Sequence, residues 1–122
     1  MPNQLTISAG QHSDKGRKPL NQDFHALMTP RAPVLNTKGI ALALADGISS
    51  SDVSQQASEA SVTGFLEDYY STSETWSVRT AAQKVLQATN SWLYNQNRNS
   101  AYRYTIEKGY VCTLSAMVLK SN

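Results

Sequence analysis

The stretch ALALADGISSSD, residues 41–52, joins an unbroken apolar run to a polar cluster that begins with an aspartate and a glycine. Before Asp46, three bulky residues alternate with three alanines: Ile40, Leu42 and Leu44 with Ala41, Ala43 and Ala45. Alternate residues of a strand point to opposite faces, so this run predicts a strand that is apolar on both faces and covered on both sides. The alanine face is expected to admit closely packed helices, and the bulky face to meet a second sheet.

The remaining segments predict three more strands and two helices. Apolar residues indicate strands at 5–9, where Leu5, Ile7 and Ala9 alternate with polar residues, at 24–28 and at 110–119. Two prolines and a glycine indicate a connecting loop over 29–39. Strands that precede a helix pair favour an α+β fold over a doubly wound parallel sheet.

The two helices are expected at 50–70 and 77–97, each with an apolar or small-residue stripe. The stripe of the first consists of Val53, Ala57, Ala60 and Gly64, and that of the second of Val78, Ala81, Ala82, Val85, Thr89 and Trp92. A serine among residues 49–51 is expected to cap the first helix.

Composition excludes several classes of protein. The net charge of +2 comes without a basic stripe, so nucleic acid is not an expected partner. No apolar run approaches the roughly 18 residues that would span a bilayer. Cys112 is the single cysteine and no metal-type Cys/His spacing occurs, so a reducing, cytoplasmic location is expected.

An aspartate followed by glycine at the end of a buried strand fits three interpretations. Asp-Gly is a common turn pair, and the aspartate can cap the next helix. A phosphoryl-accepting aspartate of the haloacid-dehalogenase type needs a second carboxylate two positions later, and Ile48 there disfavours it. A carboxylate on a rigid strand tip can instead hold Mg²⁺ or Mn²⁺, and Gly47 leaves its backbone carbonyl accessible to such an ion.

The metal interpretation needs further ligands, and residues 21–23 offer one. Asp23 stands at the start of the strand predicted at 24–28, and Asn21 can organise the loop before it. Arg17 and Lys18 lie six and five residues upstream of Asp23, a basic pair suited to hold a phosphate oxygen. The combination favours a metal-dependent phosphate site over unrelated surface residues.

Four segments, GRKPLNQD, LALADGISS, QQASEA and GYVCTLSAMVL, follow one another in an order that resembles the metal-dependent protein phosphatases, the PPM or protein phosphatase 2C family. That family has a basic residue upstream of Asn-Glu-Asp, a strand ending in Asp-Gly, and a Gly-Thr-Thr strand after two helices. The resemblance covers nearly the whole chain and is greatest to bacterial members, including those joined to a Ser/Thr kinase domain. It implies an α+β fold, a β-sandwich flanked by helices in α-β-β-α layers, of which residues 1–122 would be the N-terminal half with an antiparallel helix pair.

The resemblance also implies a function, a Mg²⁺- or Mn²⁺-dependent serine/threonine phosphatase acting on a phosphoprotein. Asp46 would bridge two metal ions, Gly47 would supply a carbonyl ligand, and Asp23 would support the cluster through bound water. Lys18 stands at the position of the family's phosphate-holding arginine, with Arg17 one residue away as the alternative. In that family a water between the two metals attacks phosphorus.

Departures from the family pattern leave a second hypothesis open. Gln22 replaces the family glutamate, Ile48 stands where many eukaryotic members have a histidine, and residues 110–112 replace most of the Gly-Thr-Thr motif ahead of Thr113. The family's further metal-binding aspartates belong to a second half of the domain. This chain alone is therefore expected to bind metal weakly, to lack efficient hydrolysis and to self-associate through apolar surface; the alternative is a non-catalytic, pseudophosphatase-like regulatory or binding domain.

Overall fold

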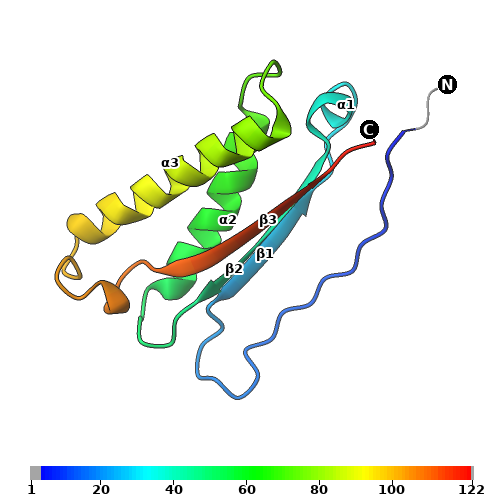
Figure 1. Cartoon of the computed structure of the whole chain (residues 1–122). Helices are drawn as coiled ribbons and strands as arrows, with labels where there is room; N and C mark the ends of the chain where they lie inside the picture. The colour runs from blue at the N-terminus through cyan, green and yellow to red at the C-terminus, as the bar shows by residue number, and fades with distance from the viewer. Residues whose placement is uncertain (1–3, 122) are drawn as a thin grey trace.

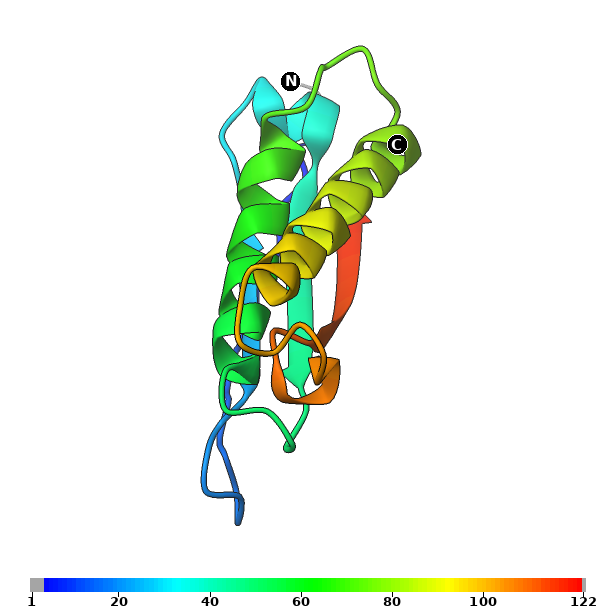
Figure 2. The same ribbon diagram turned by 90° about the vertical axis from the view of Figure 1, so that its left-hand side faces the viewer.

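The alanine-rich run forms the central strand of a three-stranded antiparallel sheet in the computed structural model, which describes residues 4–121 (Figure 1). Two long helices run in opposite directions on one face of this sheet (Figure 2). This confirms an α+β fold. The elements in chain order are β1 (Asp23–Met28), α1 (Val34–Lys38), β2 (Ile40–Gly47), α2 (Ser54–Tyr70), α3 (Val78–Arg98), the 3₁₀ turn η1 (Ile106–Lys108) and β3 (Cys112–Leu119).

The two faces of β2 have the predicted composition but different surroundings. Ala41, Ala43 and Ala45 are at most 1% exposed and belong to the core that α2 covers. On the opposite face, Leu44 is 52% exposed and Met117 of β3 is 54% exposed. Within residues 4–121 no second sheet lies against this face, so the layer expected there is not present in the described part of the chain.

Helix α2 lies directly on the sheet and α3 packs beside it. Of the stripe predicted for α2, only Ala57 is buried, and Val53, Ala60 and Gly64 are partly exposed. The rest of the buried face is made of larger and hydroxyl-bearing residues: Ser54, Ser58, Ser61, Val62, Phe65, Leu66 and Tyr69. Helix α3 begins where expected, because the Ser77 hydroxyl accepts a hydrogen bond from the Thr80 amide at 3.1 Å. Its predicted stripe is confirmed at Ala81 and Val85 but is wrong at Trp92, which is 46% exposed.

Two local predictions are wrong. Residues 4–22 contain no strand, and Ile7 is 37% exposed, because no neighbouring strand pairs with this segment. It runs on the side of the sheet away from the helices (Figure 1). The expected loop 29–39 contains the short helix α1, whose five residues are too few to show a helical apolar period.

Two tyrosines of α2 hold the end of the sheet that lies farthest from Asp46. The Tyr69 hydroxyl donates to the Lys38 carbonyl at 2.6 Å. The Tyr70 hydroxyl accepts from the Ala41 amide at 2.9 Å and lies 2.8 Å from the Gly39 carbonyl, which accepts its proton. Burial raises the pKa of Tyr70 to about 12, so this hydroxyl keeps its proton and these bonds at physiological pH.

No helix within residues 4–121 is both long and apolar enough to cross a membrane.

The two faces of β2 predict responses of different size to substitution. Ala43→Leu inserts three carbons into a close-packed contact, and we expect it to lower the free energy of unfolding by about 1–3 kcal/mol. Leu44→Ala on the exposed face should change it by roughly 0.5 kcal/mol. Urea denaturation followed by circular dichroism measures both, and an equal loss for the two variants would contradict the assignment of the faces.

Candidate metal and phosphate site

Asp23 and Asp46 lie directly opposite each other in the antiparallel pairing of β1 and β2. Both are exposed, and their strand positions place them on the open face of the sheet, with Leu44. Thr113 of β3 is the partner of Asp46 on its other side, and the Thr113 hydroxyl donates to the Asp46 carbonyl at 3.4 Å. One row across the three strands therefore carries two carboxylates and a hydroxyl.

The carboxyl groups of this row interact directly. A hydrogen bond between the Asp23 and Asp46 side chains raises the pKa of Asp23 above its ordinary range, and partial desolvation and the like charge of Asp46 add to this. The positive charge of Lys18 acts in the opposite direction. Like charges directly opposite in a sheet are destabilising, so a shared proton or a bound cation would stabilise this pair.

Asp46 is not a helix cap in this structure. Helix α2 begins with Val53 at its N-cap position and no side chain caps it, so the expected capping serine is also wrong. The Asp46 carboxylate is therefore not used by the helix that follows, which removes the simplest structural role for this residue.

Gly47 is required by packing, whatever its carbonyl binds. A Cβ atom at this position would collide with the Ser54 hydroxyl and would lie 2.9 Å from the Gln22 carbonyl. The Gly47 amide donates to that same carbonyl at 3.1 Å. Two segments thus close tightly around the glycine at the tip of β2.

Gln22, which replaces the family glutamate, does not direct its side-chain amide toward the carboxylate pair. Its side chain is 8% exposed and donates to the Ser51 carbonyl at 2.6 Å. Asn21, in contrast, organises the loop as predicted: its side-chain oxygen accepts from the Asp23 amide at 3.1 Å, and its amide donates to Ser13 at 2.9 Å.

A hollow of about 200 Å³ adjoins Asp23 and contains the predicted phosphate-binding lysine. Lys18 and Lys15 both line it, whereas Arg17 does not. Of the two candidates, Lys18 is thus the one that the structure places beside Asp23. Lys15 was missed by the sequence analysis, although its position three residues before Lys18 in a turn was a usable signal.

The serines after Asp46 form tethers to the loop before β3. The hydroxyls of Ser50 and Ser51 donate to the carbonyls of Glu107 and Gly109 at 2.6 and 2.5 Å. The Ser54 hydroxyl accepts from the Ile48 amide at 2.8 Å and donates to the Val111 carbonyl. Alternate carbonyls of residues 107–111 are thus fixed to the segment that leaves β2, which holds the start of β3 next to Asp46.

Two carboxylates are fewer than a closed metal site needs. No group of three or more His, Cys, Asp or Glu side chains comes together as a possible metal site anywhere in residues 4–121. Mg²⁺ and Mn²⁺ take six oxygen ligands, of which water can supply several. Asp23 and Asp46 therefore suit at most a weakly held, largely hydrated divalent cation, and the Gly47 carbonyl stays a predicted third ligand.

No family model matches the chain, and no curated protein or solved structure matches it either.

The carboxylate pair predicts a linked titration. Asp46→Asn removes the like charge, and its amide can donate to ionised Asp23, so the pKa of Asp23 should fall. A raised carboxyl pKa contributes stability at pH values below the ordinary pKa of aspartate, and this contribution is lost as the pH rises through the raised value. Titration of the Asp23 side-chain carbon by NMR measures the shift; exposed Asp68 offers the control, since Asp68→Asn should leave Asp23 unchanged.

Gly47→Ala should lower the free energy of unfolding by about 1–3 kcal/mol, because the added methyl displaces Ser54 or the Gln22 backbone. Gly64→Ala is the matched control: a Cβ at Gly64 meets nothing within 4 Å, and alanine in a helix interior is expected to stabilise by about 0.5–1 kcal/mol. Thermal unfolding without added metal measures both, and an unchanged Gly47→Ala variant would refute the packing role.

Proposed function

We propose that this chain carries part of the active site of a Mg²⁺- or Mn²⁺-dependent serine/threonine phosphoprotein phosphatase. The observation that supports this most directly is the facing of Asp23 and Asp46 across β1 and β2 on an exposed sheet end. Neither carboxylate caps a helix within residues 4–121, and a divalent cation between them would turn a repulsive pair into a stabilising one.

Each side chain then has a distinct task. Asp46 and Asp23 would bind the divalent cation. Asn21 fixes the backbone from which Asp23 projects. Lys18 lies close enough to influence Asp23, and its ammonium group would orient a phosphate oxygen beside the carboxylate pair. Bound divalent cations would supply charge neutralisation and a more acidic water.

The open face of the sheet fits the same proposal. Leu44 and Met117 lie half exposed there, on the face that carries the carboxylates. In a protein phosphatase 2C-like β-sandwich, of which residues 1–122 would be the N-terminal half, this face meets a second sheet that adds metal ligands. We place such a protein in the cytoplasm, with a phosphoprotein substrate and, in the bacterial arrangement, a Ser/Thr kinase domain in the same polypeptide.

A second candidate is a non-catalytic, pseudophosphatase-like binding domain. It is favoured by the small ligand set within residues 4–121, where no third carboxylate or imidazole joins Asp23 and Asp46. The same fold would then present its sheet and helices to a partner protein without hydrolysing a phosphoester. Metal binding and phosphate release, measured separately, distinguish the two candidates.

Metal binding by the 122-residue chain tests the site itself. Mn²⁺ should broaden the NMR signals of residues near Asp23, Asp46 and Thr113, with weak, roughly millimolar affinity because few ligands are available. Asp46→Asn and Asp23→Asn should each weaken binding by about tenfold or more, while Asp68→Asn should not. Broadening that is unaffected by the two site variants would place the metal elsewhere and remove the basis of the proposal.

Phosphatase activity is tested in the natural protein that contains this sequence. Mn²⁺-dependent release of phosphate from a phosphoserine or phosphothreonine peptide should fall by about a hundredfold or more in Asp46→Asn, while Asp68→Asn keeps wild-type activity. Lys18→Ala should raise KM more than it lowers kcat, with Arg17→Ala as its matched control. Metal binding without phosphate release would favour the binding domain, and the 122-residue chain alone should show no efficient turnover.

A further inference from the structure

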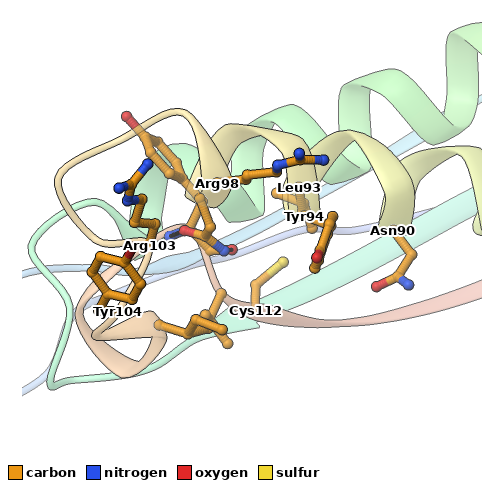
Figure 3. Close-up of a pocket in the computed structure, with 11 residues that line it drawn as sticks. Asn90, Leu93, Tyr94, Arg98, Arg103, Tyr104 and Cys112 are labelled. Carbon is orange, nitrogen blue, oxygen red and sulfur yellow. Dashed lines mark hydrogen bonds between the residues drawn. The ribbon is translucent and has the colours of Figure 1, made fainter.

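A second and larger hollow lies on the other side of β3 from the carboxylates. It has a volume of about 520 Å³ and is bounded by the last turns of α3 and by the segment that leads into β3 (Figure 3). Cys112 lies at its base, between the helix and the loop. Because Cys112 and Thr113 are consecutive strand residues, they face opposite sides of the sheet, so this hollow is separate from the Asp23–Asp46 pair.

The walls of this hollow are held in place by specific bonds. Asn97 of α3 is 7% exposed, and its side chain pairs with the backbone of Tyr110 through two hydrogen bonds of 2.7 and 3.1 Å. The rings of Tyr102 and Tyr110 meet edge to face, with centroids 6.2 Å apart. The hydroxyls of Ser50, Ser51 and Ser54 fix the carbonyls of residues 107–111 from the other side. These hydrogen bonds and ring contacts hold the loop in a fixed position as one wall of the hollow.

The lining of the hollow contains aromatic and apolar residues, and all of its charged residues are positive. Leu93, Tyr94, Tyr104 and Ile106 contribute the apolar and aromatic surface. Arg98 belongs to the last turn of α3 and Arg103 to the loop, so the two arginines line the hollow from different walls (Figure 3). None of the lining residues is acidic, so neither guanidinium has a carboxylate counter-ion inside the hollow.

We propose that this hollow binds a small organic anion in which an aromatic ring carries a carboxylate or a phosphate. The volume lies within the range of small-molecule sites. Guanidinium groups match the planar arrangement of oxygens in carboxylate and phosphate, and they bind these groups more strongly than neutral donors do. Arg103 lies over the ring of the exposed Tyr104, 4.8 Å from its centroid, so this guanidinium is held beside an aromatic surface.

NMR titration of the 122-residue chain with three one-ring probes tests the proposal. Benzoate and phenyl phosphate should shift the amides of residues 97–112 in a saturable way, with at least about tenfold higher affinity than neutral benzyl alcohol. Tighter binding of phenyl phosphate would assign the site to phosphate monoesters, and tighter binding of benzoate to carboxylates. Equal affinity for benzyl alcohol, absence of a saturable shift, or shifts confined to Asp23 and Asp46 would overturn it.

Variants of the two arginines separate charge recognition from general apolar binding. Arg98→Gln with Arg103→Gln should reduce the affinity for both anions by about tenfold or more and leave benzyl alcohol unaffected. Both residues are exposed, so the variant should fold, which thermal unfolding verifies. Arg79→Gln, an exposed arginine in the first turn of the same helix, is the matched control and should bind like the wild type.

The single cysteine provides an independent measurement. Cys112 lines the hollow and is partly exposed, so its modification reports access to the site. The anionic disulfide dithiobis(nitrobenzoate) should react with it faster in the wild type than in the double arginine variant, whereas neutral dithiodipyridine should react equally fast with both. Equal effects of the variant on the two reagents would contradict selection of anions by the arginines.

Discussion

The close approach of α2 to the central strand is the constraint on which the rest of the structure depends. Alanines at 41, 43 and 45 leave room for Phe65 and Tyr69 of α2 to pack against the strand, and all five of these residues are essentially buried. Residues 48–53 connect β2 to α2. At the end of this connection Ser54 packs against Gly47, which fixes the strand tip that carries Asp46.

Sequence patterns predicted the elements whose signals are local. The alternation of β2, the helix expected at 77–97 and the strands near 24–28 and 110–119 all depend on neighbouring residues, and the structure contains each of them. Residues 5–9 do not form the expected strand, because alternating apolar and polar residues give a half-buried face only where a neighbouring strand pairs with them. Trp92 lies on the predicted face of α3, but there it lines a hollow between α3 and α2 and does not enter the core, so it is 46% exposed.

The candidate site was predictable in its residues but not in its geometry. Asp23 and Asp46 stood out as carboxylates at strand ends, yet their exact facing depends on a register that the long 29–39 connection does not specify. The serine tethers gave no signal, since their partners lie more than fifty residues away in the chain. A capping role was the reasonable local expectation, and it was wrong in its target: the Ser51 hydroxyl accepts from the Val53 amide, at the residue before α2, and not from an amide in the first turn of the helix.

The same tethers explain why the two faces of β3 can carry separate sites. Residues 107–111 form one wall of the arginine-lined hollow and also lead directly to Thr113, the strand partner of Asp46. Loss of a tethering hydroxyl such as that of Ser51 would therefore disturb both sites together. Changes at Arg103 or Asp46, whose side chains lie at the surface, would disturb only one. A substitution can therefore abolish metal binding and leave anion binding intact, or the reverse. The two sites share the backbone of residues 107–111 as a support, but they share no side chain that faces a ligand.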